Sequence, residues 1–465
     1  MSAAPGVPGK AWHFLPLSAE TPAALEAMRL NLAQTLEADI ELDLADVAST
    51  LQLGNRELCE RAAVLGASRT ELAAALRAGS GKGWIGARNK AMRRPLVFLF
   101  PGVGEQYVNM AGDLYRCLPE FREDMDRCFT QLDRELGTNL RAVLFVDGWE
   151  RPSRQQVWLR GTPAQDEHTR GLNRTLHAQP CMFVVEYCLA RQLMRWGQYP
   201  EAVLGYSLGE FVAATLAGAI SIEDALRVVA GRARLIDALA PGVMLAVPMA
   251  AKEVAPLLSP ELSVGISNGP KLSVVSGSDV AMAKLEAVLA ASGVVSRRLS
   301  TTHAFHSPMM KPAADGLRAL LQTVKWQAPK LRCLSNVSGT WLTDAEATDP
   351  EYWVRHLCQT AHFAECLDTL LDTEDWALVE VGPGLSLSSL VRQRATVLRS
   401  DRGQVMVSAM RVLYEHDDDQ LILMQVLARL WVAGNAPDWA WFHAGESRRR
   451  ATPPINPGVS PDRPA

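Results

Sequence analysis

The residues best suited to chemistry lie in a segment that reads VLGYSLGEFVAATLAGAI, from Val203 to Ile220. An apolar run ends at Ser207, which stands between Gly205 and Gly209, and a run of small residues follows. A G-x-S-x-G pattern between a buried strand and a helix is typical of a tight turn that exposes a nucleophilic serine. Serine is also common at the start of an ordinary helix, and the segment by itself leaves both interpretations open.

A serine that attacks a carbonyl group needs hydrogen-bond donors for the oxyanion that develops. The backbone N–H of Leu208, directly after the serine and at a helix start, is one candidate. The second donor should come from a loop after a neighbouring strand. The segment FPGVG follows such an apolar run and nominates the N–H of Val103.

The serine also needs a base, and the chain has nine histidines. His303 and His306, in TTHAFHSPMM, stand where the chain is expected to return from a small subdomain to a larger one. Clefts between subdomains commonly hold active sites. No obvious aspartate completes a triad in the hydrolase order Ser–Asp–His near the C-terminal end. Asp372 and Asp375 are possible third members, but their spacing indicates nothing.

An α/β fold is expected to position these residues. The short apolar runs PLVFLF and AVLGYS favour buried parallel strands. From Gly242 the order of expected elements is β-α-β-β-α-β, which is ferredoxin-like. We therefore predict a large α/β-hydrolase-like subdomain with a parallel sheet over residues 94–241 and 304–400, and an inserted ferredoxin-like small subdomain over residues 242–303.

The remaining segments have simpler patterns. Residues 1–93 are expected to form a small α/β domain, and residues 401–465 to contain one amphipathic helix and a proline-rich tail. Residues 153–174 are polar and aperiodic, which indicates an exposed loop. The apolar stretch that begins at Ala178 predicts a long helix with Pro180 in its first turn.

Composition excludes several classes of protein. A length of 465 residues suggests about three domains. The formal net charge of −4 argues against nucleic acid as a partner. None of the eight cysteines forms a C-x-x-C pair, so neither a metal site nor a disulfide framework is indicated. The N-terminus lacks a signal peptide, and no apolar run reaches the roughly 18 residues of a membrane helix. We expect a cytoplasmic protein that does not bind membranes.

Several motifs occur in one order over about 300 residues: FPGVGEQY, QPCMF, GYSLGE, GRARL, SNGPKLSVVSG, HAFHSPMM and EVGPG. Together they closely resemble the acyltransferase domains of modular type I polyketide synthases, and more distantly the malonyl-CoA:acyl carrier protein transacylases. Residues 1–93 resemble the linker between ketosynthase and acyltransferase, and residues 401–465 resemble the linker after the acyltransferase.

The resemblance implies a Ser–His dyad that moves a malonyl-type extender unit from CoA to the phosphopantetheine thiol of an acyl carrier protein. It implies no tightly bound cofactor, and as partners the carrier protein and a ketosynthase or other synthase domains. In this resemblance Ser207 is the nucleophile, His306 is the general base, and the backbone N–H groups of Val103 and Leu208 bind the oxyanion. Arg232 binds the free carboxylate of the substrate, and Gln179 and Asn268 line the pocket. The backbone carbonyl of His356 orients the His306 ring.

The choice of acyl group is expected to depend on the HAFH motif, because in this family HAFH accompanies malonyl and YASH accompanies methylmalonyl. Phe305 would fill the space beside the substrate α-carbon, and His303 belongs to the same motif. One methyl group in an apolar pocket is worth only about 1–3 kcal/mol. Tyr206 replaces the histidine that usually precedes the nucleophile, which leaves the acyl preference open.

Two other positions depart from the family pattern, and two alternative functions follow from the sequence. Val103 stands where glutamine is common, and HLCQTAHF lacks the usual proline.

The first alternative function is a hydrolase that removes acyl groups from carrier proteins; such an enzyme would not need Arg232. The second is a non-catalytic docking module, which would have no need of Ser207 and His306.

Overall fold

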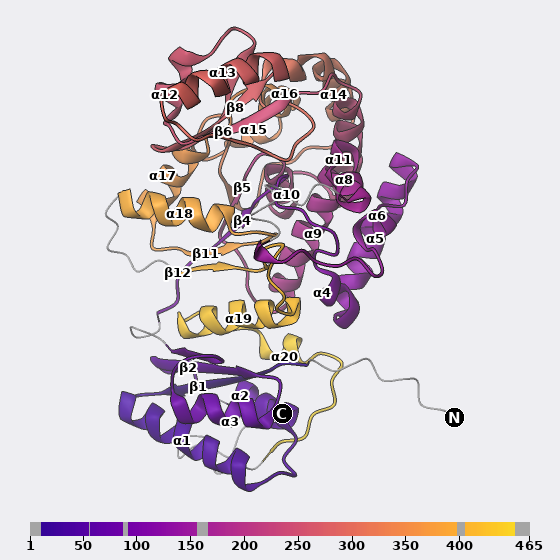
Figure 1. The fold of residues 1–465 in the computed structure, drawn as a ribbon. Helices are drawn as coiled ribbons and strands as arrows, with labels where there is room; N and C mark the ends of the chain where they lie inside the picture. Colours follow the sequence, from indigo (N-terminus) through magenta and orange to yellow (C-terminus); the bar gives the residue numbers. More distant parts are fainter. Residues whose placement is uncertain (1–10, 55, 87–91, 156–165, 398–404, 452–465) are drawn as a thin grey trace.

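The computed structural model describes residues 11–54, 56–86, 92–155, 166–397 and 405–451. Three separate sheets organise these residues, and Figure 1 shows them stacked along the long axis of the molecule. A five-stranded sheet occupies the middle, a four-stranded sheet lies at one end and a three-stranded sheet at the other. Within the described residues, no helix is long and apolar enough to cross a membrane.

The five-stranded sheet is entirely parallel and has the order β10-β5-β4-β11-β12. Its strands are β4 (Leu96–Phe100), β5 (Ala202–Gly205), β10 (Arg332–Cys333), β11 (Ala377–Glu380) and β12 (Val405–Ser408). Every residue of β4, β5 and β11 is buried, as expected for central strands covered by helices on both faces. The apolar runs that predict these strands carry no alternation because neither face meets water.

Helices surround this sheet and form most of the main core. They are α4 (Gly112–Cys117), α5 (Pro119–Leu136), α6 (Leu140–Leu144), α8 (Glu167–Asn173), α9 (Thr175–Arg195), α10 (Gly209–Leu216), α11 (Ile222–Asp237), η2 (Pro308–Ala313), α14 (Ala314–Leu321), α15 (Asp344–Ala347), α16 (Pro350–Cys358), α17 (Phe363–Thr373) and α18 (Ser386–Val397). Ser221 caps α11 by accepting a hydrogen bond from the N–H of Asp224 at 3.1 Å.

The four-stranded sheet confirms the ferredoxin-like prediction. It is antiparallel with the order β7-β8-β6-β9, and consists of β6 (Val243–Val247), β7 (Leu262–Gly269), β8 (Leu272–Gly277) and β9 (Arg297–Arg298), with α12 (Ala251–Val254), η1 (Ala255–Leu257) and α13 (Asp279–Ala291) between them. All of these elements lie inside residues 242–303. A bridge between Ile266 and Ala361 joins this small subdomain to the large one.

The N-terminal domain is an antiparallel sheet of β1 (His13–Ala19), β2 (Glu60–Gly66) and β3 (Trp84–Gly86), covered on one face by α1 (Pro22–Ala38), α2 (Leu44–Gly54) and α3 (Arg69–Ala78). Its other face packs on α19 (Asp419–Val432), which lies between this sheet and β12 (Figure 1). The Arg61 guanidinium of β2 lies 4.2 Å from the Trp431 ring of α19. A short helix, α20 (Trp439–Phe442), follows.

Three sequence predictions are wrong. The boundary at residue 400 excludes β12, yet β12 pairs with β11 as the edge strand of the large sheet. Residues 167–173 form α8, capped by Asp166, within a segment predicted to be a loop. Helix α9 begins at Thr175, so Pro180 lies inside the helix. A short helix made mostly of polar residues has no apolar periodicity by which it could be recognised in the sequence. A proline inside a helix cannot be distinguished from a first-turn proline by the sequence pattern alone. Residues 156–165 and the proline-rich tail from residue 452 lie outside the described residues.

Candidate active site

Ser207 lies at a sharp turn between β5 and α10, and its backbone adopts a φ of 53°. This left-handed conformation is uncommon for a residue with a side chain. The flanking glycines are required by close contacts, because a Cβ atom on Gly205 would overlap the backbone of Glu210, and one on Gly209 would overlap the carbonyl of Phe100. The structure thus answers the choice left open by the sequence: Ser207 occupies a strained turn and not an ordinary helix cap.

The Ser207 hydroxyl meets the ring of His306, with 2.7 Å between Oγ and Nε2. On the other side of the ring, Nδ1 lies 3.2 Å from the backbone carbonyl of Gln359. A carbonyl oxygen can only accept a hydrogen bond, so Nδ1 carries the proton and the lone pair of Nε2 faces the serine. Burial, the neighbouring His356 ring and the Arg232 guanidinium together lower the pKa of His306 from 6.5 to about 3, which keeps the base neutral.

The structure adds a second carbonyl to the one predicted at His356. Nδ1 of His306 lies 3.2 Å from the carbonyl of Gln359, three residues farther along the chain, and the carbonyl of His356 also favours the protonated ring. The side chain of His356 is buried, and its Nε2 lies 3.4 Å from Glu210 Oε2. Every residue has a backbone carbonyl, so residue type could not identify the additional one at Gln359.

Asn336 holds the turn around Ser207. Its Oδ1 accepts the N–H of Ser207 at 2.9 Å, and its Nδ2 donates to the carbonyl of Gly205 at 2.7 Å. Its own N–H donates to Glu210 Oε2 at 2.8 Å, and the Tyr352 hydroxyl donates to the other oxygen of Glu210. One amide side chain therefore ties together the end of β5, the nucleophile and the start of α10.

The two predicted oxyanion donors flank the same turn. The loop after β4 lies against it, because a Cβ atom on Gly102 would overlap the carbonyl of Tyr206 and approach the N atom of Leu208 to 3.5 Å. Among the described residues, neither the N–H of Val103 nor that of Leu208 has a hydrogen-bond acceptor in the protein. Two free N–H groups beside a nucleophile are suited to bind a developing oxyanion.

Arg232, on α11, is the unusual charge of the site, because this residue is only 1% exposed. It donates to Gln179 Oε1, and within the described part of the chain no carboxylate pairs with it. Burial lowers the pKa of Arg232 from 12.5 to about 10, so the group remains charged near neutral pH. Arg232 Nε and Gln179 Nε2 are buried donors without partners. A buried cation beside unused donors is suited to an anionic ligand.

The remaining predicted residues border this region. Asn268 of β7 donates to the Tyr206 hydroxyl at 3.2 Å, and the Tyr206 ring packs edge-on against Phe363 at 4.9 Å. The Phe305 ring lies 6.0 Å from the guanidinium carbon of Arg232. His303 Nδ1 lies 2.9 Å from the hydroxyls of both Thr175 and Thr302, so its side chain joins the start of α9 to the returning chain.

Sequence reasoning missed Asn336, Glu210, Tyr352 and Gln359. Asn336 and Tyr352 contact the turn from more than 120 positions away in the chain, and the sequence contains no pattern that joins them to Ser207. Glu210 is the last residue of the quoted motif GYSLGE, which was the one available signal.

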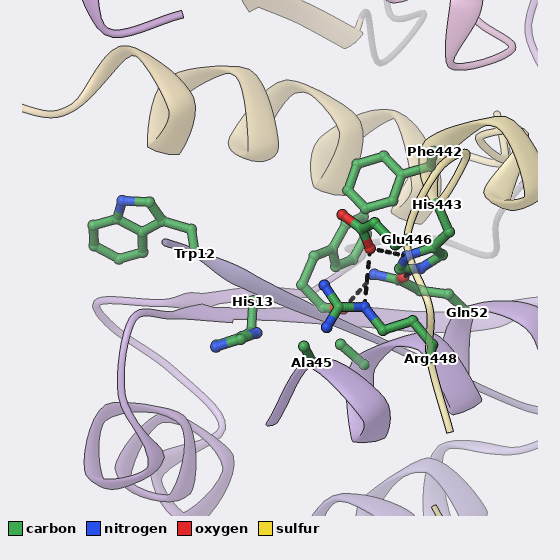
Figure 2. A pocket seen from close by; sticks show the side chains of 10 residues that line it. Trp12, His13, Ala45, Gln52, Phe442, His443, Glu446 and Arg448 are labelled. Atoms are coloured by element: carbon green, nitrogen blue, oxygen red, sulfur yellow. Dashed lines mark hydrogen bonds and ion pairs between the residues drawn. The ribbon is translucent and has the colours of Figure 1, made fainter. Parts of the chain in front are cut away.

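A separate hollow lies between the N-terminal domain and the segment after α20. The hollow is lined by His13 and Gln52 of the N-terminal domain and by His443, Glu446 and Arg448 of the later segment. Figure 2 shows Gln52 beside His443 and Glu446, with His13 farther away. None of these residues belongs to the Ser207 site. His443 Nε2 bonds Gln52, which in turn donates to the carbonyl of Phe14 at 2.8 Å, so these side chains connect the two segments.

Comparison with known proteins places the chain in a family. The family model of the acyl transferase domain matches residues 97–436, and a model described as the CurL-like polyketide synthase C-terminal region matches residues 13–76. One of the phenolphthiocerol/phthiocerol polyketide synthase proteins of Mycobacterium tuberculosis is 34% identical over 435 residues. Mycoketide-CoA synthase of the same species is 34% identical over 427 residues. Both alignments cover 91% of this chain, but only 28% and 10% of the relatives, respectively.

Solved structures give the same result. The acyl transferase domain of ZmaA matches with a TM-score of 0.85 and 32% identity, over 97% of this chain and all of that domain. The acyl transferase domain of SpnD matches with a TM-score of 0.80 and 37% identity, over 93% of this chain and 98% of that domain. The malonyl-CoA:acyl carrier protein transacylase of Xanthomonas oryzae matches with a TM-score of 0.57 and 26% identity, over 69% of this chain and 96% of that one. The chain therefore belongs to the acyltransferase domains of modular type I polyketide synthases, and is a transferase related to the malonyl-CoA:acyl carrier protein transacylases.

Proposed function

We propose that this acyltransferase moves a malonyl-type extender unit from CoA, through an acyl ester on Ser207, to the phosphopantetheine thiol of an acyl carrier protein during polyketide biosynthesis. The observation that carries the proposal is Arg232: a buried guanidinium with no carboxylate partner among the described residues, in the same site as the Ser207–His306 pair. A malonyl thioester supplies both the missing carboxylate and the reactive carbonyl.

In the first half-reaction the Ser207 hydroxyl attacks the thioester carbonyl of the acyl-CoA. His306 Nε2, at 2.7 Å, takes the hydroxyl proton, and the Gln359 carbonyl holds the ring in the tautomer that can accept it. The oxyanion binds to the N–H groups of Val103 and Leu208. When the tetrahedral intermediate collapses, the proton passes from His306 to the departing sulfur, which leaves CoA thiol and acyl-Ser207.

The second half-reaction is the reverse with a different thiol. His306 takes the proton of the phosphopantetheine thiol, the thiolate sulfur attacks the ester of acyl-Ser207, and the proton returns to the serine oxygen. Transfer predominates over hydrolysis if water is excluded while the acyl ester exists. No metal or other cofactor takes part in either step as proposed.

Arg232 and Gln179 bind the free carboxylate of the malonyl group. The guanidinium offers its unpartnered Nε, and Gln179 offers its unpartnered Nε2. The planar guanidinium can bind a carboxylate through two parallel hydrogen bonds, which a lysine cannot do. The SpnD domain, a solved relative, is in complex with a substituted malonyl group, which supports this class of acyl unit.

We propose unsubstituted malonyl as the preferred unit. Phe305 stands near Arg232 and would occupy the space that a branch at the α-carbon needs. The Tyr206–Asn268 hydrogen bond joins the residue before the nucleophile to the small subdomain, so Tyr206 limits the same space from the other side. His303 acts on selectivity through the fixed position of this returning segment, because its ring is bonded to threonines.

Intact-mass measurement after incubation with malonyl-, methylmalonyl- and acetyl-CoA tests the proposal. We expect a malonyl adduct that is absent from Ser207→Ala and that is passed to a carrier protein bearing phosphopantetheine. Release of free acid without acylation of the carrier protein would support the editing hydrolase instead. Absence of both adduct and turnover would support the docking module.

A further inference from the structure

Two buried carboxyl groups and a partly exposed one lie near the oxyanion loop, Pro101–Gly104, and the reaction as proposed uses none of them. They belong to Glu186 on α9, Glu380 at the end of β11, and Glu105 just after the loop. Buried carboxyl groups are uncommon unless they serve a purpose, so each needs an explanation.

Two of the three have other partners. Glu380 accepts the N–H groups of Leu387 and Ser388, both at 2.9 Å, and so fixes the start of α18. Glu105 accepts the hydroxyl of Ser386. Both groups therefore fasten the first turn of α18, and no hydrogen bond joins either of their side chains to the described backbone of the oxyanion loop.

Glu186 is bonded to the loop itself. Its Oε1 accepts the N–H of Gly102 at 2.8 Å, and the side chain has no exposed surface. Gly102 directly precedes Val103, whose free N–H is the second oxyanion donor. On its other side Gly102 lies against the carbonyl of Tyr206 so closely that no side chain would fit, and its φ is 69°. Glu186 and the nucleophile turn thus hold this peptide from opposite sides.

The surroundings of Glu186 fit it tightly in this position. A Cβ atom on Gly382 would overlap Pro101 and lie 3.2 Å from Cγ of Glu186, so the loop after β11 packs on both. Burial, with a further contribution from Glu380, raises the pKa of Glu186 well above its usual range. A neutral carboxylic acid can still accept the N–H of Gly102, and glutamine is its uncharged isostere.

We propose that Glu186 is a positioning residue that fixes the oxyanion loop, and through Gly102 sets the direction of the Val103 N–H in the transition state. Glu186 lies seven residues after Gln179 on α9, which is two helical turns along the same face. One helix therefore carries both the proposed carboxylate-binding amide and the anchor of the oxyanion donor. The inference rests on the proposed function, since it assigns Val103 its part in that reaction.

Three variants test the proposal. Glu186→Met removes the acceptor and keeps the volume, Glu186→Gln keeps the acceptor, and Gln192→Met makes a similar change in the same helix at another buried position. The rate of Ser207 acylation by malonyl-CoA is measured in a single turnover by rapid quench and intact mass. The inhibition constant of free malonate reports on carboxylate binding, and thermal unfolding reports on the fold.

We expect Glu186→Met to slow acylation about 10- to 100-fold, because small displacements of a catalytic group have effects of this size. Its inhibition constant for malonate should change less than about threefold, and Glu186→Gln and Gln192→Met should acylate within about threefold of the unchanged protein. A slower acylation rate without weaker malonate binding, restored in Glu186→Gln, is a result that a merely structural role of Glu186 would not produce.

The proposal is overturned if Glu186→Met acylates at the normal rate, if malonate binding falls in parallel with the rate, or if Glu186→Gln is as slow as Glu186→Met. Should the methionine variant not fold, Glu186→Asp, which withdraws the same carboxyl by one methylene, replaces it with the same expected outcome. If the unchanged protein accepts no malonyl-CoA, the proposed function fails, and the acylation rate is then measured with the acyl-CoA that does modify Ser207.

Discussion

Replacing Arg232 with methionine removes the guanidinium and keeps an unbranched apolar chain in its place. Arg232 is 1% exposed, and its guanidinium donates to the neutral amide of Gln179. Burial lowers the pKa of Arg232 from 12.5 to about 10. At about 1.4 kcal/mol per pH unit, the charged state costs about 3 kcal/mol in this position. A bound carboxylate is expected to offset this cost.

The expected loss of activity follows from this cost of about 3 kcal/mol. If the malonyl carboxylate is what offsets it, Arg232→Met should lower kcat/KM for malonyl-CoA by at least about 10²-fold. The kcat/KM for acetyl-CoA, which brings no carboxylate, should stay constant or rise. The free energy of unfolding should not fall, because an apolar chain replaces an unpaired buried charge.

Rates of Ser207 acylation by the two acyl-CoAs, together with thermal unfolding, check these outcomes. Arg232→Lys is the matched control, since it keeps the charge but cannot form two parallel hydrogen bonds, and it should fall between the other two proteins. Equal losses with malonyl-CoA and acetyl-CoA would refute the assignment of Arg232 to the carboxylate. A clear fall in stability would refute the conclusion that its charge is uncompensated.

Three further predictions concern the turn, the pocket and the base. Asn336→Ala leaves the Ser207 N–H and the Gly205 carbonyl without partners, so it should cost about 1–3 kcal/mol in thermal unfolding and slow acylation; unchanged values for both would contradict its role. Tyr206→Phe removes the hydroxyl that is hydrogen-bonded to Asn268 and keeps the ring that packs on Phe363. The preference for malonyl-CoA over methylmalonyl-CoA, measured in a competition assay, should therefore fall, but by less than about tenfold. A stronger preference for malonyl-CoA would contradict this prediction. The pKa of His306 is about 3, well below the 6.5 of an unfolded histidine, so the base stays neutral as the pH falls. The value of kcat/KM for a malonyl thioester that lacks the CoA phosphates should therefore be constant from pH 8 to pH 5. An inflection near pH 6.5 would show that the His306 ring is not desolvated.

The structure around a residue could be predicted from the sequence where that structure restricts which residue types fit. Gly205 and Gly209 indicate the turn at Ser207 because no side chain fits there, and the apolar runs indicate the parallel strands because both faces are covered. The β-α-β-β-α-β order of residues 242–303 likewise predicted the small sheet. In each case the pattern along the chain reflects a requirement of its immediate surroundings.

Contacts that join distant segments could not be predicted in this way. Asn336 reaches Ser207 across 129 positions, and nothing in SNVSG indicates that its amide faces a nucleophile. The carbonyl of Gln359 contacts His306 by its position alone, so the family pattern indicated only the carbonyl of His356. β12 was assigned to a linker because an edge strand of four residues has too short a pattern to be recognised.

The sheet of the N-terminal domain has a consequence for engineering. Its alternating residues serve two different cores: Leu15 and Val64 face α1–α3, whereas Phe14 and Leu65 join the core that contains α19. α19 also packs on β12, next to the strand that leads into the Gly382 loop. An exchange of acyltransferase cassettes between synthases that cuts near residue 94 would leave apolar surface open on α19. We therefore expect that a cassette running from β1 to the segment beyond α20 can be exchanged with both of these cores intact, and that hybrid enzymes cut there keep their solubility and their rate of acylation.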